Sequence, residues 1–235
     1  MTIIKNRQKI MDHIERAAIN HNRSSQSIQL LAVSKTWPSE QIRQLASAGQ
    51  HDFGENYLQE ALIKIKLLHD LDLTWHFIGP IQSNKTKDIA RYFDWVHSVD
   101  RSKIAQRLSK QRPEDLSPLN VCIQVNIDNE DSKSGINESA IIPLAEQIDL
   151  LGNLTLRGLM IIPSKTDDIE QQRHSFHKAH ALYQQLCAKY PSIDTLSMGM
   201  SNDMATAISE GSTMVRIGSA IFGQRTTHPT LGQVN

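Results

Sequence analysis

The chain has 235 residues, and its 25 Lys and Arg residues balance its 25 Asp and Glu residues, so the formal net charge is zero. That length allows one large domain with a substantial hydrophobic core. The balanced charge predicts no nucleic-acid or anionic-membrane partner, because both need an excess of basic groups. Cys122 and Cys187 are too far apart for a CxxC motif, and reduced thiols of this kind predict a cytoplasmic protein. The N-terminal segment lacks the apolar stretch of a secretion signal, and no apolar run reaches the ~20 residues that span a bilayer.

Short β-rich segments alternate with longer segments of helical spacing. The expected strands are Gln29–Val33, Asp52–Gly54, Thr74–Ile78, Trp95–Val99, Leu119–Ile127, Thr155–Ile161, Thr195–Met198 and Thr213–Ile217. Between them, apolar residues recur three and four positions apart, as at Leu58, Ala61, Leu62, Ile65 and Leu68. Pro38 suits the first turn of a helix that runs to about Ala48, and Gly49 suits its end. An additional helix, from about Ile4 to Asn20, precedes the first strand.

Several strands are apolar throughout, as in residues 30–33 and 159–162. Strands that are covered on both faces have this composition, as parallel strands flanked by helices do. Eight βα units in roughly 200 residues predict an α/β fold, a (β/α)8 TIM-type barrel. The barrel is expected to form a single domain over residues 1–235, with the additional helix at its N-terminus. An open doubly wound sheet is the alternative, but the number of strands favours the barrel.

Lys35 closes the first apolar strand, at the end where barrels of this type carry their chemistry. Burial at the barrel mouth would favour the neutral amine, which is the form that attacks an aldehyde to make a Schiff base. The alternative is a lysine that extends along the strand end to reach water. Position alone favours this solvated lysine, because isolated lysines are common at protein surfaces.

Two glycine-containing turns follow the seventh and eighth strands, at residues 199–203 and 218–220. Glycine lets a ligand approach the backbone, and the N–H groups at a helix start attract an anion. Loops at these two positions recur as phosphate sites in this fold. The alternative to a phosphate site is ordinary turn formation together with N-capping by Ser201. Two adjacent turns of this kind make that alternative less favoured.

Arg216 lies in an apolar strand, where a buried charge needs a partner. That partner is either an acidic side chain of a neighbouring strand or a ligand atom. A guanidinium that donates to a pyridine nitrogen would keep that nitrogen unprotonated. The ring would then be a weak electron sink, which predicts slow or absent carbanion chemistry.

The remaining polar residues carry weaker signals. Asn56 and His76 could line the mouth, although a histidine between two aromatic residues is at least as often a satisfied core group. Lys133, in a polar loop, and Lys85 and Lys87, at a helix start, are by default solvated. The sequence contains no zinc-protease, α/β-hydrolase or P-loop motif.

At these residues the chain resembles the pyridoxal phosphate homeostasis protein family, also called the YggS or PROSC type. The strings that carry the resemblance are LLAVSKTWP (30–38), FGENYLQE (53–60), WHFIGPIQSNK (75–85), HSVDR (97–101), VNIDNEDSKSG (125–135), LRGLMIIP (156–163) and LSMGMSNDMATAISEGSTMVRIGSAIFGQR (196–225). They follow the family's order from the first strand to the eighth. The resemblance implies a barrel similar to the N-terminal domain of alanine racemase, with pyridoxal 5′-phosphate (PLP) at its mouth.

The resemblance also implies a role for each matching residue. Lys35 is the lysine that forms the internal aldimine, and Arg216 faces the pyridine nitrogen. Asn56 lies near the cofactor ring, and Lys133 is a loop lysine near the site that takes part in cofactor transfer. The phosphate is bound by Ser201, Gly218 and Ser219, with the backbone of Met200 assisting.

We therefore expect a cytoplasmic, monomeric protein that holds PLP reversibly and buffers it or delivers it to PLP-dependent apoenzymes, without substantial catalysis of its own. Racemases of this fold add a β-domain that supplies a catalytic tyrosine, and little sequence follows the eighth strand here. One alternative is a racemase-like PLP enzyme acting on amino acids. A second is an aldolase or isomerase that uses Lys35 on a sugar phosphate without a cofactor, and a third is a scaffold with a vestigial site.

Overall fold

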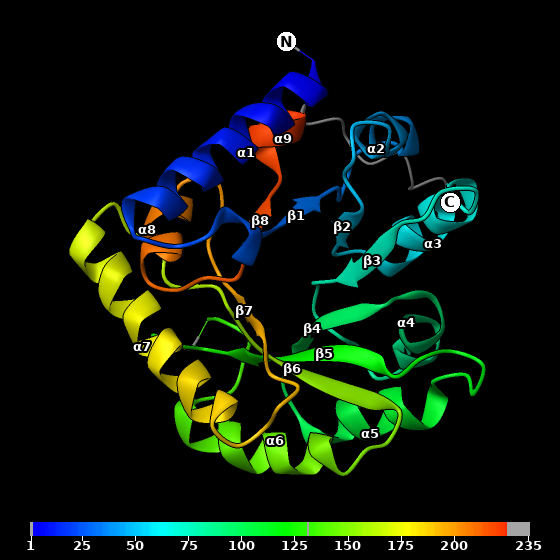
Figure 1. Cartoon of the computed structure of the whole chain (residues 1–235). Helices are drawn as coiled ribbons and strands as arrows, with labels where there is room; N and C mark the ends of the chain where they lie inside the picture. Colours follow the sequence, from blue (N-terminus) through cyan, green and yellow to red (C-terminus); the bar gives the residue numbers. More distant parts are fainter. Residues whose placement is uncertain (1, 131, 225–235) are drawn as a thin grey trace.

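Eight parallel strands close into one barrel in the computed structural model, which describes residues 2–130 and 132–224 (Figure 1). The strands are β1 (Gln29–Val33), β2 (Asp52–Glu55), β3 (Thr74–Phe77), β4 (Trp95–Val99), β5 (Leu119–Val125), β6 (Leu154–Ile161), β7 (Thr195–Ser197) and β8 (Met214–Ile217). Each strand pairs with the next along the chain, and β8 pairs with β1, which closes the ring. The prediction of a (β/α)8 barrel is confirmed, and the open doubly wound sheet is excluded.

Helices cover the outside of the barrel (Figure 1). They are α1 (Ile3–Asn20), α2 (Ser39–Ala46), α3 (Leu58–Leu67), α4 (Thr86–Tyr92), α5 (Ser102–Gln111), α6 (Ile141–Asp149), α7 (Ile169–Cys187), α8 (Met204–Ser209) and α9 (Ser219–Phe222). Two short 3-10 helices, η1 (Ser25–Ser27) and η2 (Glu138–Ala140), precede β1 and α6. Helices cover the outward side chains of the strands, which explains why strand segments such as residues 30–33 are apolar throughout.

The additional helix α1 packs against α2, α8 and α9, beside the place where β8 meets β1 (Figure 1). Its buried residues recur with helical spacing at Ile10, Ile14, Ala17 and Ala18. The side-chain amide of Asn6 donates to the carbonyl of Ile221 at 2.9 Å and ties this helix to α9. Helix α1 therefore holds α9, the last helix of the described residues, in place.

The expected boundaries agree with the structure to within a few residues, and the differences have local causes. β5 ends at Val125 because the next N–H, of Asn126, donates to the carbonyl of Ile136 at 2.9 Å and leaves the sheet. Pro38 precedes α2 with an extended ψ of 155° and does not lie in its first turn. Gly49 has a φ of +81°, the left-handed conformation expected just after a helix.

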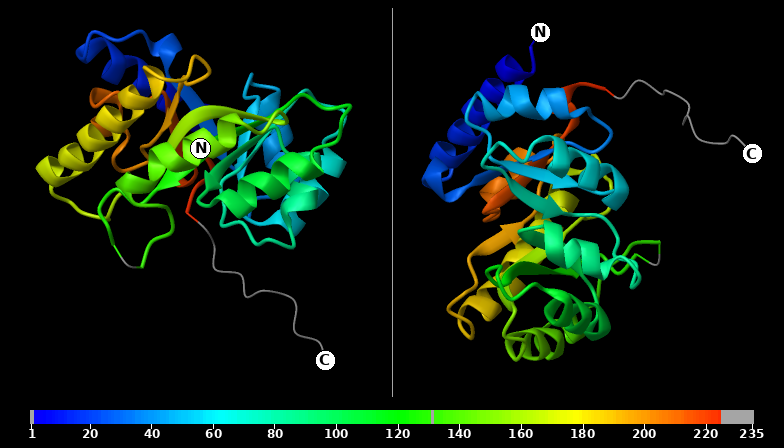
Figure 2. Two further views of the ribbon diagram at one scale, coloured as in Figure 1. Left: turned by 90° about the horizontal axis from the view of Figure 1, so that it is seen from below. Right: turned by 90° about the vertical axis from the view of Figure 1, so that its right-hand side faces the viewer.

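The loop between β5 and α6 and the short helix α9 project from the same side of the barrel (Figure 2). This is the end at which the strands finish, so these segments surround the barrel mouth. No helix in the described part of the chain combines the length and the apolar composition that crossing a membrane requires.

Candidate functional site

One large cavity, of about 1190 Å³, opens at the carboxyl ends of the strands. Its wall includes every residue for which the sequence predicts a role in the site, namely Lys35, Asn56, Lys133, Met200, Ser201, Arg216, Gly218 and Ser219. These residues lie at the ends of five strands, β1, β2, β5, β7 and β8, or in the loops that follow them, and they are spread over 185 positions of the chain. The barrel brings them together because parallel strands all finish at the same end.

Behind the β1 end of the cavity lies a cluster of three charged side chains, of which Lys64 and Glu55 are buried and Glu60 is partly exposed. The ammonium of Lys64, in α3, is 4% exposed and donates to Glu55 Oε1 at 2.7 Å and to Glu60 Oε1 at 2.5 Å. Burial raises the pKa of Glu55, and the neighbouring Lys64 opposes that effect. We call these three residues the charged clamp, because they hold the backbone on both sides of Lys35.

The clamp contacts the residues immediately before and after Lys35. The Ser34 hydroxyl donates to Glu55 Oε1 at 2.6 Å, and its carbonyl accepts from the clamp lysine at 2.7 Å. The Thr36 N–H donates to Glu60 Oε1 at 2.6 Å. Thr36 has a φ of +68°, a strained conformation for a β-branched residue that surrounding contacts must maintain. The clamp therefore determines where the half-buried Lys35 leaves the strand.

The two glycine-containing turns meet at the part of the cavity wall that β7 and β8 form, next to the β1 end. Ser201 Oγ and Ser219 Oγ are 3.4 Å apart, although the two residues belong to successive loops. The Met200 N–H donates to Asp203 Oδ1 at 2.5 Å, which closes the first turn. Ser219 begins α9, and the first N–H groups of a helix have no intrahelical acceptor. Two hydroxyls and a helix start thus face one point, a suitable arrangement for an anion.

Arg216 lies on the floor of the cavity and is 5% exposed. Its Nη1 donates to the carbonyl of Ser197 at 2.6 Å and to that residue's hydroxyl at 2.9 Å, and its Nη2 donates to the carbonyl of Ile161 at 2.8 Å. Burial lowers its pKa to about 10, so it remains a guanidinium at neutral pH, with Asp203 as its nearby acidic charge. Among the described residues no acidic side chain of a neighbouring strand forms a salt bridge with Arg216; carbonyl oxygens and a hydroxyl of β6 and β7 hold it instead, and its side chain also lines the cavity, where a ligand atom could accept from it.

Asn56 follows β2, and its side-chain oxygen Oδ1 is buried without a hydrogen-bond partner among the described residues. Gly79 holds this segment by close backbone contact, because a Cβ at Gly79 would lie 2.2 Å from the carbonyl oxygen of Asn56. A buried acceptor without a donor is costly, so this atom marks a position where a ligand donor would fit.

Replacing Gly79 by alanine is expected to lower the free energy of unfolding by about 1–3 kcal/mol, since the new methyl group displaces the Asn56 backbone. Gly152→Ala is the matched control, because a Cβ there meets nothing within 4 Å. We expect the control to stay within about 0.5 kcal/mol of the wild type. Urea denaturation of the three proteins measures the difference, and equal stabilities for both variants would contradict the packing argument.

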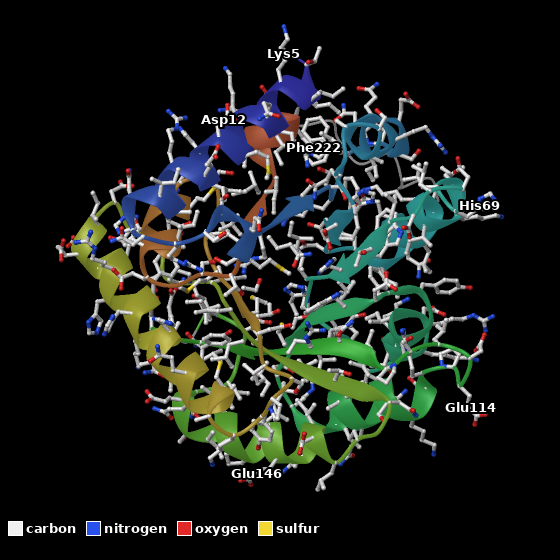
Figure 3. The ribbon with its side chains drawn as sticks, viewed as in Figure 1. Lys5, Asp12, His69, Glu114, Glu146 and Phe222 are labelled. Carbon is white, nitrogen blue, oxygen red and sulfur yellow. The ribbon has the colours of Figure 1, made fainter. Side chains whose placement is uncertain are left out.

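The structure places Lys133 at the cavity and His76 in the interior of the barrel. Lys133 is not simply solvated: it lines the cavity and pairs with Glu130 Oε2 at 3.0 Å. His76 lies inside the barrel and does not reach the cavity wall, so it is the core group that the sequence left as its alternative. Sequence reasoning missed Trp37, which lines the cavity and stacks on Phe222 at 5.7 Å between ring centroids. Phe222, at the end of α9, is labelled in Figure 3. An aromatic residue directly before Pro38 was the available signal.

The fold and the site place the chain in a known class. Residues 10–226 match the family described as the alanine racemase N-terminal domain. The chain is 58% identical over 207 residues to the pyridoxal phosphate homeostasis protein of Vibrio alginolyticus, covering 86% of this chain and 89% of that protein. It is 53% identical over 229 residues to that of Pasteurella multocida, covering 96% and 98%. The chain therefore belongs to the pyridoxal phosphate homeostasis protein family.

A solved structure in this class shows a ligand. PipY from Synechococcus elongatus, determined with PLP bound, superposes with a TM-score of 0.78 at 37% identity, covering 89% of this chain and 99% of that chain.

Proposed function

We propose that this chain binds PLP in the cavity through a reversible Schiff base with Lys35 and takes part in PLP homeostasis by buffering or delivering the cofactor. The observation that carries the proposal is the convergence of an amine, a guanidinium, an unpartnered buried acceptor and two hydroxyl-bearing turns on one cavity. Membership of the homeostasis family and the PLP-bound PipY structure support the same cofactor.

The residues present fit the functional groups of PLP. Asn56 Oδ1 needs a donor, and the 3-hydroxyl of the pyridine ring is one. Ser201 and Ser219, with the α9 start, offer donors for the phosphate, and the turns at residues 199–203 and 218–220 admit it close to the backbone. Arg216 can only donate, so it suits an unprotonated ring nitrogen.

The cavity residues have separate tasks. The neutral amine of Lys35 condenses with the aldehyde: a C=N bond forms, one water is released, and hydrolysis reverses the reaction. When bound, PLP supplies this aldehyde and a ring that withdraws electrons. Arg216 limits that withdrawal because it stabilises the unprotonated nitrogen.

Two features favour a carrier over a racemase-like enzyme. The weakly withdrawing ring disfavours carbanion formation. Among the described residues, the cavity wall also includes no histidine or tyrosine, so a racemase-like enzyme would have to use one of the lysines or carboxylates there as its second acid or base. We extend the proposal to a monomeric, cytoplasmic carrier that supplies apoenzymes, with Lys133 at the cavity edge assisting release.

The test is a visible absorption spectrum of the full-length protein incubated with PLP, before and after sodium borohydride. We expect a Schiff-base band that borohydride removes, and mass spectrometry should then locate the reduced adduct on the peptide that contains Lys35. A protein that stays colourless would overturn the proposal and favour the sugar-phosphate alternative. Deuterium exchange at Cα of the common amino acids, at a useful rate, would instead establish a racemase-like enzyme.

A further inference from the structure

A chain of hydrogen bonds runs through the barrel interior from the start of β2 to the floor of the cavity. Asp52 Oδ1 lies 3.1 Å from His76 Nε2, and His76 Nδ1 lies 2.9 Å from His97 Nε2. His97 Nδ1 lies 3.1 Å from Ser197 Oγ, which accepts from Arg216 Nη1 at 2.9 Å. We call Asp52, His76, His97 and Ser197 the interior relay. It joins β2, β3, β4, β7 and β8 and ends at the guanidinium beneath the cavity.

The two ends determine the direction of every bond between them. Arg216 can only donate, so Ser197 Oγ accepts from it, and in a relay that runs in one direction the hydroxyl gives its own proton to His97 Nδ1. His97 then donates from Nε2 to His76 Nδ1, and His76 donates from Nε2 to the carboxylate of Asp52. In this direction each histidine holds a proton on Nε2 and accepts at Nδ1, so each relay contact has one donor and one acceptor.

Burial supports this assignment. His76, His97 and Ser197 each have an exposed fraction of 0%. Burial, together with the charge of Arg216, lowers the pKa of His97 well below its ordinary range. The ring of His76 stacks on Trp95 with an interplanar angle of 13°, which fixes its orientation.

The far end of the relay is accessible to solvent, unlike its interior. The side chain of Asp52 is 20% exposed. Burial opposes the ionisation of Asp52, but the hydrogen bond from His76 contributes to a net lowering of its pKa. The carboxylate is therefore a stable acceptor at neutral pH.

We propose that the interior relay positions Arg216, so that the negative charge at the far end of the barrel controls how strongly the guanidinium donates to a ligand in the cavity. This inference rests on the proposed function, because the ligand used to detect it is PLP. Hydrogen bonds aligned in one direction polarise one another in a low-dielectric interior, so a carboxylate at one end strengthens the acceptor at the other. The relay residues do not line the cavity and act only through Arg216.

The test combines Asp52→Asn and Ser197→Ala, singly and together, in the full-length protein. Asp94→Asn is the matched control, because Asp94 also lies at the start of a strand and accepts from the Trp75 N–H at 2.8 Å, outside the relay. Two quantities are measured with PLP labelled with ¹⁵N in its ring: the dissociation constant and the ¹⁵N chemical shift of the ring nitrogen. In the protein without PLP, the ¹⁵N shifts of the histidine rings report the tautomers.

We expect Asp52→Asn to raise the dissociation constant by about three- to tenfold, within the range for coupling in hydrogen-bonded networks, and to shift the ring-nitrogen resonance. Asp94→Asn should change neither. In the Ser197→Ala background the relay is already broken, so Asp52→Asn should have no further effect.

Several results would overturn the proposal. One is an Asp52→Asn protein that binds PLP like Asp94→Asn with an unchanged ring resonance. Another is an undiminished Asp52→Asn effect when Ser197 is alanine, and a third is an Nδ1–H tautomer at either histidine. If Ser197→Ala does not fold, the comparison of Asp52→Asn with Asp94→Asn still tests the proposal. A wild type that binds no PLP would instead refute the proposed function, and the tautomers would then test the relay geometry separately.

Discussion

Replacing Lys35 by alanine is expected to abolish the borohydride-stable bond to PLP while leaving weaker, reversible binding. The alanine variant lacks the amine that forms the C=N bond, but Arg216 and the two serine-bearing turns remain in place. We expect the dissociation constant to rise by about tenfold or more, which corresponds to about 1.4 kcal/mol or more of binding free energy. Absorbance titration, followed by reduction and mass spectrometry of the variant, measures both effects.

Lys165→Ala provides the control, because Lys165 is a second lysine in the cavity wall and lies in the loop after β6. This variant should retain the reducible adduct on Lys35, since the clamp that places Lys35 is unchanged. An adduct that persists in Lys35→Ala and maps to Lys133 or Lys165 would show that another amine captures the aldehyde. The role assigned to Lys35 would then be wrong.

The barrel could be predicted from the sequence because its signals are local. Short β-rich segments, several of them apolar throughout, alternate with segments of helical spacing and mark each βα unit without knowledge of its neighbours. The candidate site followed from a second local rule, that polar residues directly after barrel strands face the mouth. Lys35 and Ser219 satisfy this rule, and both line the cavity.

The interior relay and the charged clamp could not be predicted in the same way, because they depend on partners far apart in the chain. His97 and Ser197 are 100 positions apart, and each lies in a strand whose pattern says nothing about the other. Lys64 did offer a signal: it lies on the apolar stripe of its helix, three positions after Ala61. A lysine on a buried stripe needs a buried anion, but which residue supplies that anion depends on the tertiary structure.

Lys64→Met is expected to lower the free energy of unfolding by about 3–5 kcal/mol, the usual consequence of leaving one charge of a buried pair without its partner. Glu55 has an exposed fraction of 0%, and its Oε2 already has no hydrogen-bond partner among the described residues. Without the ammonium, its carboxylate would be buried uncompensated, and Glu60 would lose its partner in holding Thr36. Formation of the Schiff-base band at Lys35 should therefore also be slower.

The pH dependence distinguishes this explanation from simple loss of packing. Burial raises the pKa of Glu55 in the wild type, and removal of Lys64 should raise it further. A carboxyl with a raised pKa binds its proton more tightly in the folded state than in the unfolded state. The contribution of Glu55 to the free energy of unfolding is therefore greatest at low pH, and it is lost as the pH rises through that pKa. The stability deficit of Lys64→Met should thus be largest at high pH and shrink in acid.

Two further variants test whether the charge of Lys64 accounts for the loss of stability. Glu55→Gln combined with Lys64→Met removes the uncompensated charge and should recover much of the lost stability, because a neutral amide can still accept from the Ser34 hydroxyl. Lys66→Met, at an exposed position of the same helix, should change the free energy of unfolding by less than about 0.5 kcal/mol. The loss of stability in Lys64→Met could instead be independent of pH and unchanged by Glu55→Gln. That result would show that Lys64 stabilises the barrel through its methylene chain and that its charge does not hold Lys35 in place.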